Sequence, residues 1–277
     1  MKDVLSSLPS IGESLKKHSI LTKKSFGQHF IFDLGLTTKI ARCAGDLSDC
    51  IVLEIGPGPG ALTRSILALG AKKVIAVEKD ARMLPILKEI KNAVGNQLEI
   101  IHADALEIVE EEFGDKIKVI ANLPYNISTE LLFKWLDKIN LFQSLTLMFQ
   151  KEVARRIAAK PNTKDYGRIS VIAQWLAEIR AEFDVPPGAF VPPPKITSTV
   201  LNITPYPKPL YPAKMENLKT VAKAFNQRRK ILRGSLKQIT PEPEKLLEMA
   251  GINPGLRPES LTIQDFCKLA LALESML

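Results

Sequence analysis

The chain has 277 residues, and its content of 45% hydrophobic and 25% charged residues is typical of a folded protein with a sizeable core, which excludes collagen-like, coiled-coil and wholly disordered chains. Basic residues outnumber acidic residues by 38 to 30, and the resulting net charge of +8 favours a polyanionic partner. No stretch without a charged residue exceeds twelve residues, whereas a membrane-spanning helix needs about 20 apolar residues.

From residue 51 to residue 150, short apolar segments alternate with segments whose apolar residues have helical spacing, which is typical of a parallel sheet with crossover helices. The predicted strands are residues 51–55, 74–77, 98–102, 119–121 and 144–149. The predicted helices between them are residues 61–69, 81–94 and 128–139. The pattern therefore predicts an α/β fold.

The alternation changes after residue 150. Helices are predicted at residues 151–159 and 169–177, followed by strands at 179–185 and 197–203 that form a hairpin at the sheet edge. Residues 205–212 contain four prolines and are predicted to form a stiff, extended linker. Because everything beyond the linker is predicted to be helical, we place a domain boundary between residues 206 and 207.

A glycine-rich segment, Glu54-Ile-Gly-Pro-Gly-Pro-Gly60, directly follows the first predicted strand and precedes a helix. Glycine at every second position lets the backbone turn sharply and lets a ligand lie close to the main chain, so we expect Gly56 and Gly58 at a cofactor. The spacing is not the G-x-G-x-x-G of dinucleotide folds, and no G-K-[ST] follows, which disfavours NAD and ATP. S-adenosylmethionine has no pyrophosphate, so its site needs no phosphate-binding loop. We therefore predict that this cofactor binds here.

A carboxylate for the cofactor ribose is available at the end of the next strand. Glu78 lies 18 residues after Gly60, where its oxygens can accept hydrogen bonds from two ribose hydroxyls. The alternative is a Gly-Pro turn that only reverses the chain, with a surface glutamate. After the third strand, Asp104 either accepts a hydrogen bond from the adenine amine of the cofactor or caps a helix N-terminus.

The fourth strand ends in Asn122-Leu-Pro-Tyr125, which we interpret as a site for an aromatic amine. The lone pair of an exocyclic amine on a base is delocalised into the ring, so the nitrogen is a poor nucleophile. If the Asn122 side-chain oxygen and the Leu123 carbonyl accept its two N–H bonds, the lone pair can be directed at an electrophilic methyl. Tyr125 would stack on the base. A plain turn is the alternative.

Five motifs together resemble the ribosomal RNA adenine dimethyltransferase family, most closely its bacterial small-subunit branch, from about Lys23 to the C-terminus. They are Lys23-Lys-Ser-Phe-Gly-Gln-His-Phe30, Glu54-Ile-Gly-Pro-Gly-Pro-Gly-Ala-Leu-Thr63, Asn122-Leu-Pro-Tyr-Asn-Ile-Ser128, Gln150-Lys-Glu-Val153 and Phe190-Val-Pro-Pro-Pro-Lys195. The resemblance implies a Rossmann-like class I methyltransferase domain (residues 1–206, with an N-terminal extension at 1–22) and a small all-helical RNA-binding domain (207–277). It also implies dimethylation of the N6 amines of two adjacent adenosines in the 3′-terminal hairpin loop of 16S rRNA during small-subunit biogenesis.

The resemblance also assigns residues to the site. Cofactor contacts are expected at Gln28, His29, Ile31, Gly56, Glu78, Asp104, Ala105 and Asn122. The target adenine is expected at Asn122, Leu123, Pro124 and Tyr125, with Phe190 as a second aromatic face. His29 stands where the family commonly has asparagine. A cofactor contact made by the main chain would be kept at this position, whereas one made by the asparagine side chain would be lost. A histidine without ligand contact and a core phenylalanine are the alternatives for His29 and Phe190.

The densest cationic segment, Lys223–Lys237, contains six basic residues and no acid. We expect its cations to bind RNA phosphates, helped by Lys16, Lys17, Lys23 and Lys24, although one solvated helix face is the alternative. The cations are Lys223, Arg228, Arg229, Lys230, Arg233 and Lys237. An unpaired loop is the expected target because its bases leave their stack at low cost.

Three rival functions share much of this pattern: a large-subunit rRNA adenine N6-methyltransferase, a DNA adenine methyltransferase, and a non-catalytic RNA-binding ribosome assembly factor. The DNA enzymes usually carry a larger target-reading domain. The N-terminus lacks the apolar core of a secretory signal, and the three cysteines and three histidines show no zinc spacing. We therefore expect a cytoplasmic monomer without a metal.

Overall fold

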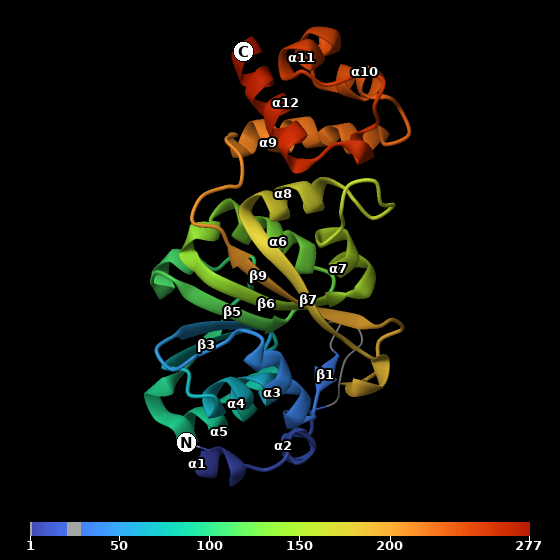
Figure 1. Ribbon diagram of the computed structural model, residues 1–277. Helices are drawn as coiled ribbons and strands as arrows, with labels where there is room; N and C mark the ends of the chain where they lie inside the picture. Colours follow the sequence, from blue (N-terminus) through green and yellow to red (C-terminus); the bar gives the residue numbers. More distant parts are fainter. Residues whose placement is uncertain (1, 21–28) are drawn as a thin grey trace. The chain divides into compact units, whose positions relative to one another are not determined.

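The computed structural model describes residues 2–20 and 29–277, which divide into two compact units (Figure 1). The first, called the sheet unit, combines the described residues up to Ala154 with Arg180–Pro205. The second, called the helical unit, combines Arg155–Ile179 with Tyr206–Leu277. In the part of the chain that is described, no helix is long and apolar enough to cross a membrane.

A seven-stranded sheet in the order β4-β3-β2-β5-β6-β9-β7 is the main feature of the sheet unit. Neighbouring strands from β4 to β6 pair in parallel, and β9 pairs antiparallel with β6. The strands are β2 (Ile51–Ile55), β3 (Lys73–Glu78), β4 (Leu98–His102), β5 (Ile117–Asn122), β6 (Phe142–Gln150), β7 (Ala177–Val185) and β9 (Ser198–Pro205). All seven predicted strands are confirmed, and β7 and β9 lie together at the sheet edge as predicted.

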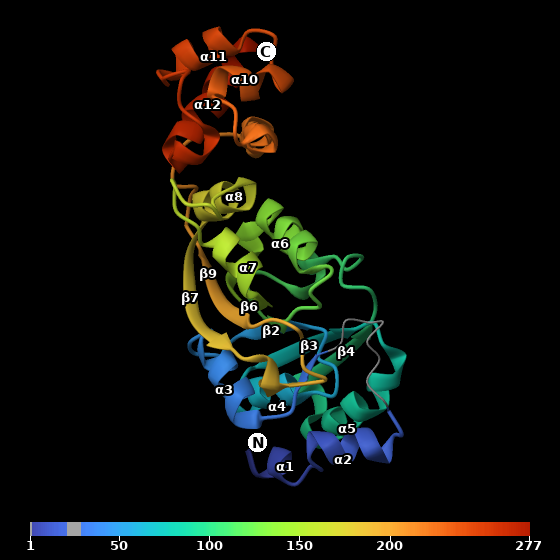
Figure 2. The same ribbon diagram turned by 90° about the vertical axis from the view of Figure 1, so that its right-hand side faces the viewer.

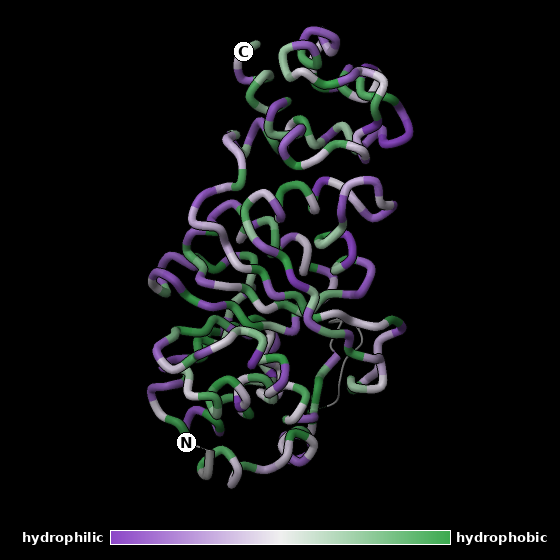
Figure 3. Tube along the Cα trace, in the orientation of Figure 1, coloured by the Kyte–Doolittle hydropathy of each residue, from purple (hydrophilic) through white to green (hydrophobic). Residues whose placement is uncertain are grey.

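Helices cover both faces of the sheet, with α3, α4 and α5 on one face and α6 on the other (Figures 1 and 2). Central strands buried on both faces have nearly continuous apolar sequences, which Figure 3 shows as hydrophobic segments through the middle of this unit. The helices are α1 (Lys2–Ser6), α2 (Ile11–Lys17), α3 (Leu34–Arg42), α4 (Ala61–Ala68), α5 (Leu84–Val94), α6 (Ser128–Asp137) and α7 (Lys151–Ile157).

The N-terminal extension, whose structure was not predicted, packs on α4 and α5. Ser10 and Glu13 form a capping box at the start of α2. The buried Arg64 of α4 donates from Nη1 to the carbonyl oxygen of Pro9 at 2.6 Å. Lys17 forms an ion pair with Glu89 of α5 at 2.6 Å. The extension is therefore fixed to the helices that follow the glycine-rich segment and β3.

A second, two-stranded sheet joins segments about 160 residues apart in the sequence. Here β1 (Phe30–Ile31) pairs antiparallel with β8 (Phe190–Val191), with Phe30 opposite Val191 and Ile31 opposite Phe190. Neither strand was predicted, because two-residue strands have no recognisable periodicity. Their pairing brings His29 beside residues 192–194, which are three prolines and which we call the proline-rich loop.

The helical unit contains a small aromatic core. Phe225 stacks on Phe266 with ring centroids 5.3 Å apart, and Tyr166 contacts the edge of Phe225. Its helices are α8 (Arg168–Leu176), α9 (Met215–Val221), α10 (Leu232–Ser235), α11 (Pro243–Ala250) and α12 (Ile263–Met276). Short 3₁₀ helices in the two units are η2 (Ala81–Met83), η3 (Gly95–Gln97), η4 (Glu110–Phe113), η5 (Ile139–Leu141), η6 (Pro187–Ala189), η7 (Ala222–Gln227), η8 (Leu236–Gln238) and η9 (Pro258–Ser260).

The proline-rich linker does not run free, because it is hydrogen-bonded to the end of α8. The main-chain N–H groups of Tyr206 and Leu210 donate to the carbonyls of Leu176 and Trp175, and the Trp175 indole donates to Tyr211. Contacts also group Arg155–Ile179 with the C-terminal helices, although these residues precede the predicted boundary at residue 206. The assignment of catalysis and RNA binding to separate domains stays a prediction.

Candidate active site

The strand order places several loops at one edge of the sheet. β2 pairs with β3 on one side and with β5 on the other, so the chain moves outward through β3 and β4 and then returns to the far side of β2. In doubly wound sheets, ligands bind at the carboxyl ends of the strands beside such a switch point. The ends of β2, β3, β4 and β5 and the loops that follow them carry most of the predicted site residues, whereas His29, Ile31 and Phe190 lie at β1 and β8.

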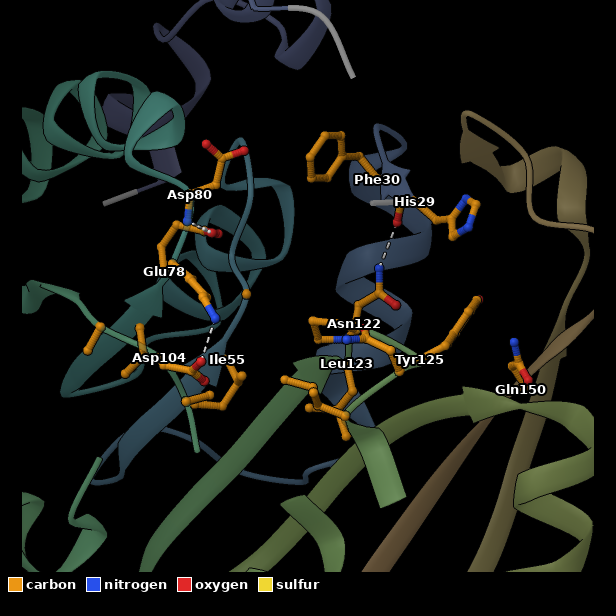
Figure 4. Close-up of a pocket in the computed structure, with 18 residues that line it drawn as sticks. His29, Phe30, Ile55, Glu78, Asp80, Asp104, Asn122, Leu123, Tyr125 and Gln150 are labelled. Carbon is orange, nitrogen blue, oxygen red and sulfur yellow. Dashed lines mark hydrogen bonds and ion pairs between the residues drawn. The ribbon is translucent and has the colours of Figure 1, made fainter. Parts of the chain in front are cut away.

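A pocket of about 700 Å³ lies at this edge, within the usual range of about 300–1,000 Å³ for small-molecule sites. The predicted residues that line it are His29, Gly56, Glu78, Asp104, Ala105, Asn122, Leu123, Pro124 and Tyr125. Glu78 and Asp104 lie on one side, and Asn122, Leu123 and Tyr125 lie on the other (Figure 4). Ile31, Gly58 and Phe190 lie close to it without lining it, and Gln28 is outside the described residues.

The glycine-rich loop needs glycine for both its conformation and its packing. Gly56 and Gly58 have φ angles of +67° and +55°, in the left-handed region that other residues rarely adopt. A β-carbon at Gly58 would lie 2.5 Å from the ring of Phe30. The Gly58 N–H donates to Glu78 Oε2 at 2.9 Å, which ties the loop to the end of β3.

Two buried carboxyl groups lie beneath this loop. Glu78 is 7% exposed and accepts hydrogen bonds from the N–H groups of Gly58 and Asp80, while burial raises its pKa. Glu54 accepts a 2.6 Å hydrogen bond from the Thr63 hydroxyl of α4, and burial raises its pKa to about 8. Glu54 does not line the main pocket. Its contacts join β2 to α4, whereas Glu78 lines the pocket on the side of Asp104.

Asp104 does not cap a helix in the structure, and its contact with the adenine of the cofactor stays a prediction. Its carboxylate lines the pocket, and its Oδ1 accepts from the Leu106 N–H in a turn rather than in a helix. Lys79 Nζ donates to Oδ2 at 2.6 Å, and this hydrogen bond is the main reason that the pKa of Asp104 is lowered. The side chain is therefore a charged acceptor at the adenine end of the predicted cofactor site.

An ionic cluster of Lys134, Lys138 and the buried Glu110 contacts the loop after β4. Lys134 of α6 donates to the carbonyls of Ala105 and Ile108, at 3.3 and 2.6 Å, and it lies 3.0 Å from the carboxylate of Glu110, which is 0% exposed. Lys138 pairs with the same carboxylate at 2.7 Å. Burial raises the pKa of Glu110, but its hydrogen-bonding partners outweigh that effect and the pKa is lowered. The cluster fixes the backbone of Ala105, which lines the pocket.

The Asn122 carboxamide has a defined orientation. Its Nδ2 donates to the main-chain carbonyl of His29 at 3.0 Å (Figure 4). Among the residues that the structure describes, no group donates to Oδ1 of Asn122. The side chain therefore presents an acceptor in the pocket, which is the chemistry that an exocyclic amine requires.

Tyr125 lies at the pocket rather than in the core. Its hydroxyl shares a 2.6 Å hydrogen bond with Ser198 of β9, and burial raises its pKa. Its ring stacks against His29, with centroids 5.7 Å apart. Phe190 is 2% exposed and contacts the His29 ring with its edge. Its predicted role as a second face for the target base stays a prediction.

Comparison with known proteins agrees with this geometry. The model of the family described as ribosomal RNA adenine dimethylase matches residues 20–275. The chain is 52% identical to ribosomal RNA small subunit methyltransferase A of Ruegeria sp. (strain TM1040) over 98% of each chain, and 53% identical to the protein of that name from Paracoccus denitrificans over 96% of each.

The chain belongs to the ribosomal RNA adenine dimethylase family. A crystal structure of a dimethyladenosine transferase from Plasmodium falciparum is similar, with a TM-score of 0.79 and 29% identity over 89% of this chain and 98% of that one. The crystal structure of the 23S rRNA methyltransferase ErmE is also similar, with a TM-score of 0.67 and 25% identity over 88% of this chain and 99% of that one. The predicted family and the class I methyltransferase fold are confirmed, and the chain is an rRNA adenine methyltransferase. Fold and family together imply the use of S-adenosylmethionine.

Several pocket residues were not predicted. Most of them are next to a predicted residue in the sequence, for example Phe30, Lys79 and Ala103. Asp80, two residues after Glu78, could have been found from its place after β3. Gln150 ends β6 and begins a motif that carried the family resemblance, although no role was assigned to it.

We expect Gly58→Ala to destabilise the protein more than Gly70→Ala. Both positions have positive φ angles, of +55° and +90°, but a β-carbon at Gly70 would meet no atom within 4 Å. The backbone strain is therefore shared, and crowding of Phe30 should add about 1–3 kcal/mol at Gly58. Urea denaturation of both variants measures the difference, and equal losses of unfolding free energy would contradict the packing argument.

We expect Lys134→Met to weaken binding of S-adenosylhomocysteine about three- to tenfold, because the loop of Ala105 loses two hydrogen bonds. Lys138→Met is the matched control, since it removes a cation from Glu110 without touching the Ala105 carbonyl. Calorimetric titration of both variants tests the prediction. If both variants lost the same affinity for S-adenosylhomocysteine, the effect would come from the uncompensated charge on Glu110 and not from the Ala105 loop.

Proposed function

We propose that this chain transfers two methyl groups to the N6 amine of each of two adjacent adenosines in the 3′-terminal hairpin loop of 16S rRNA. The observation that carries the proposal is the fixed carboxamide of Asn122, whose oxygen is presented to the pocket while its nitrogen is held by His29. Relatives at 52% and 53% identity are named for the small ribosomal subunit. Action as a monomer is part of the proposal.

The pocket residues fit S-adenosylmethionine. The carboxylate of Glu78 would accept the ribose hydroxyls, Asp104 and Ala105 would hold the adenine, and Gly56 permits close approach to the main chain. A contact through the main chain of His29 would not depend on its side chain. When bound, S-adenosylmethionine supplies an electrophilic methyl group on a positively charged sulfur. Direct contacts of Gln28, Ile31 and Gly58 with the cofactor remain part of the proposal.

The residues after β5 would position and activate the target amine. Oδ1 of Asn122 and the Leu123 carbonyl accept its two N–H bonds, which turns the nitrogen lone pair toward the methyl group, and Pro124 holds the turn. Tyr125, anchored through its hydroxyl by Ser198, stacks on the base. Because the acceptors are in place before the reaction, catalysis rests on orientation and preorganised electrostatics. The nitrogen becomes acidic as it gains a methyl, and its proton passes to water without a dedicated base.

RNA binding is proposed for Lys223–Lys237, but not for every cation in it. Arg228 donates to Glu259 at 2.6 Å and to the main-chain carbonyls of Thr163 and Lys164, so it stabilises the helical unit. The segment is also not one helix, because η7, α10 and η8 divide it. The exposed cations proposed to contact phosphates are Lys223, Arg229, Lys230, Arg233 and Lys237.

The N-terminal lysines support RNA binding less directly. Lys17 is paired with Glu89, and Lys23 and Lys24 lie outside the described residues. Lys16 is exposed on α2. We therefore base the proposed phosphate contacts mainly on the helical unit.

The decisive experiment incubates the protein with labelled S-adenosylmethionine and either immature small subunits or large subunits, followed by nuclease digestion and nucleoside analysis. Labelled N6,N6-dimethyladenosine from the small subunit alone is expected. Label in large-subunit RNA would support the large-subunit alternative. Cofactor binding without any labelled nucleoside would support a non-catalytic assembly factor.

We expect Asn122→Ala to lower turnover by about 10²- to 10³-fold, the usual effect of removing one preorganised polar group, and to change cofactor affinity much less. Glu78→Ala should show the opposite balance, with cofactor affinity reduced about tenfold or more because two ribose hydroxyls lose their acceptor. Single-turnover rates and calorimetric affinities measure the two effects. Normal turnover in Asn122→Ala would remove the basis of the proposed mechanism.

We expect the double variant Arg229→Gln, Lys230→Gln to bind 16S rRNA more weakly and with a shallower salt dependence. Losing two phosphate contacts should reduce the slope of log K against log salt by about 1.4–1.8. Arg228→Gln is the control, because it should lower the unfolding free energy and leave the slope nearly unchanged. A steep slope retained in the double variant would place the phosphate contacts elsewhere.

A further inference from the structure

The side chain of His29 lies on the target-base side of the pocket, although the residue was predicted as a cofactor contact. Its main-chain carbonyl accepts from Asn122. Its imidazole turns toward Tyr125, and both lie at the same pocket (Figure 4). The main chain and the side chain of His29 therefore have separate tasks.

Three contacts hold the imidazole in this position. Its ring is stacked against Tyr125, with a centroid distance of 5.7 Å and an interplanar angle of 29°. It meets Phe190 edge-on, at 6.5 Å and 81°. Nδ1 donates to the main-chain carbonyl of Pro192 at 2.8 Å. The imidazole thus contacts the same two rings, Tyr125 and Phe190, that are predicted to hold the target adenine.

The imidazole and a base cannot both occupy this face of Tyr125 without movement. Stacked bases are separated by about 3.4 Å, so a base between the two rings would need about 7 Å between the ring planes. The centroid distance of 5.7 Å is an upper limit for that separation. In Figure 4 the Asn122 carboxamide and the imidazole lie on the same side of the Tyr125 ring, so the base would approach from the occupied side.

We propose that the imidazole of His29 occupies the place of the target base on Tyr125 in the RNA-free enzyme and leaves it when the base binds. This inference rests on the proposed function, because it takes Tyr125 as the stacking partner of the adenine. Displacement breaks the hydrogen bond from Nδ1 to Pro192 and the stacking on Tyr125. The carbonyl that orients Asn122 belongs to the main chain and stays in place. His29 is thus a positioning residue that opposes base entry and leaves the cofactor side unchanged.

The test compares His29→Ala with the wild-type enzyme, using the full chain, immature small subunits and saturating S-adenosylmethionine. Removal of the competing ring should raise kcat/KM for the subunit about three- to tenfold, the range expected for one stacking contact and one neutral hydrogen bond. Affinity for S-adenosylhomocysteine should stay within about twofold. An unchanged or lower kcat/KM would overturn the proposal, and a drop would show that the imidazole supports the base.

Two further variants keep the outcome interpretable. His29→Asn removes the ring but keeps a polar side chain, and it should show the same gain if His29→Ala does not fold. Tyr125→Leu tests the underlying function separately: if it retains wild-type kcat/KM, the target base does not stack on Tyr125 and the proposed function fails at this point. If Tyr125→Leu loses activity while both His29 variants show no gain, only the inference about His29 fails.

Discussion

The hydrogen bond from Asn122 Nδ2 to the His29 carbonyl is the interaction on which the site depends. A carboxamide has one donor end and one acceptor end, and fixing the donor decides where the acceptor points. The bond also joins the end of β5 to the segment that leads into β1. This contact therefore fixes the position of an acceptor in the pocket and links the end of β5 to the segment before β1.

The sheet explains why the remaining parts of the site meet. Because β2 lies between β3 and β5, the glycine loop, the carboxylate of Glu78 and the turn after Asn122 come from neighbouring strand ends. Glu78 is held by two main-chain N–H groups, and Asp104 is held by Lys79 and a turn. Acceptors with fixed positions surround the cofactor side, which agrees with a reaction that depends on orientation more than on proton transfer.

The sequence was most informative where structure is local. Buried parallel strands have nearly continuous apolar sequences, so the residues at their carboxyl ends, such as Glu78 and Asn122, could be placed together at one sheet edge. Contacts between distant segments had no such signal. The pairing of β1 with β8, the hold of Lys134 on the Ala105 loop and the anchoring of Arg228 to Glu259 all depend on tertiary packing. The grouping of Arg155–Ile179 with the C-terminal helices depends on the same kind of contact between distant segments.

The ribbon of β1 and β8 has a consequence for attempts to alter this enzyme. It joins Phe30 and Ile31, beside the glycine loop, to Phe190 and Val191, beside the proline-rich loop. A loop transplanted from another methyltransferase to change base preference would therefore have to bring both strands, because a length change in either one shifts the register of the other. Any redesign of one of these two segments has to include the other, because the ribbon couples them.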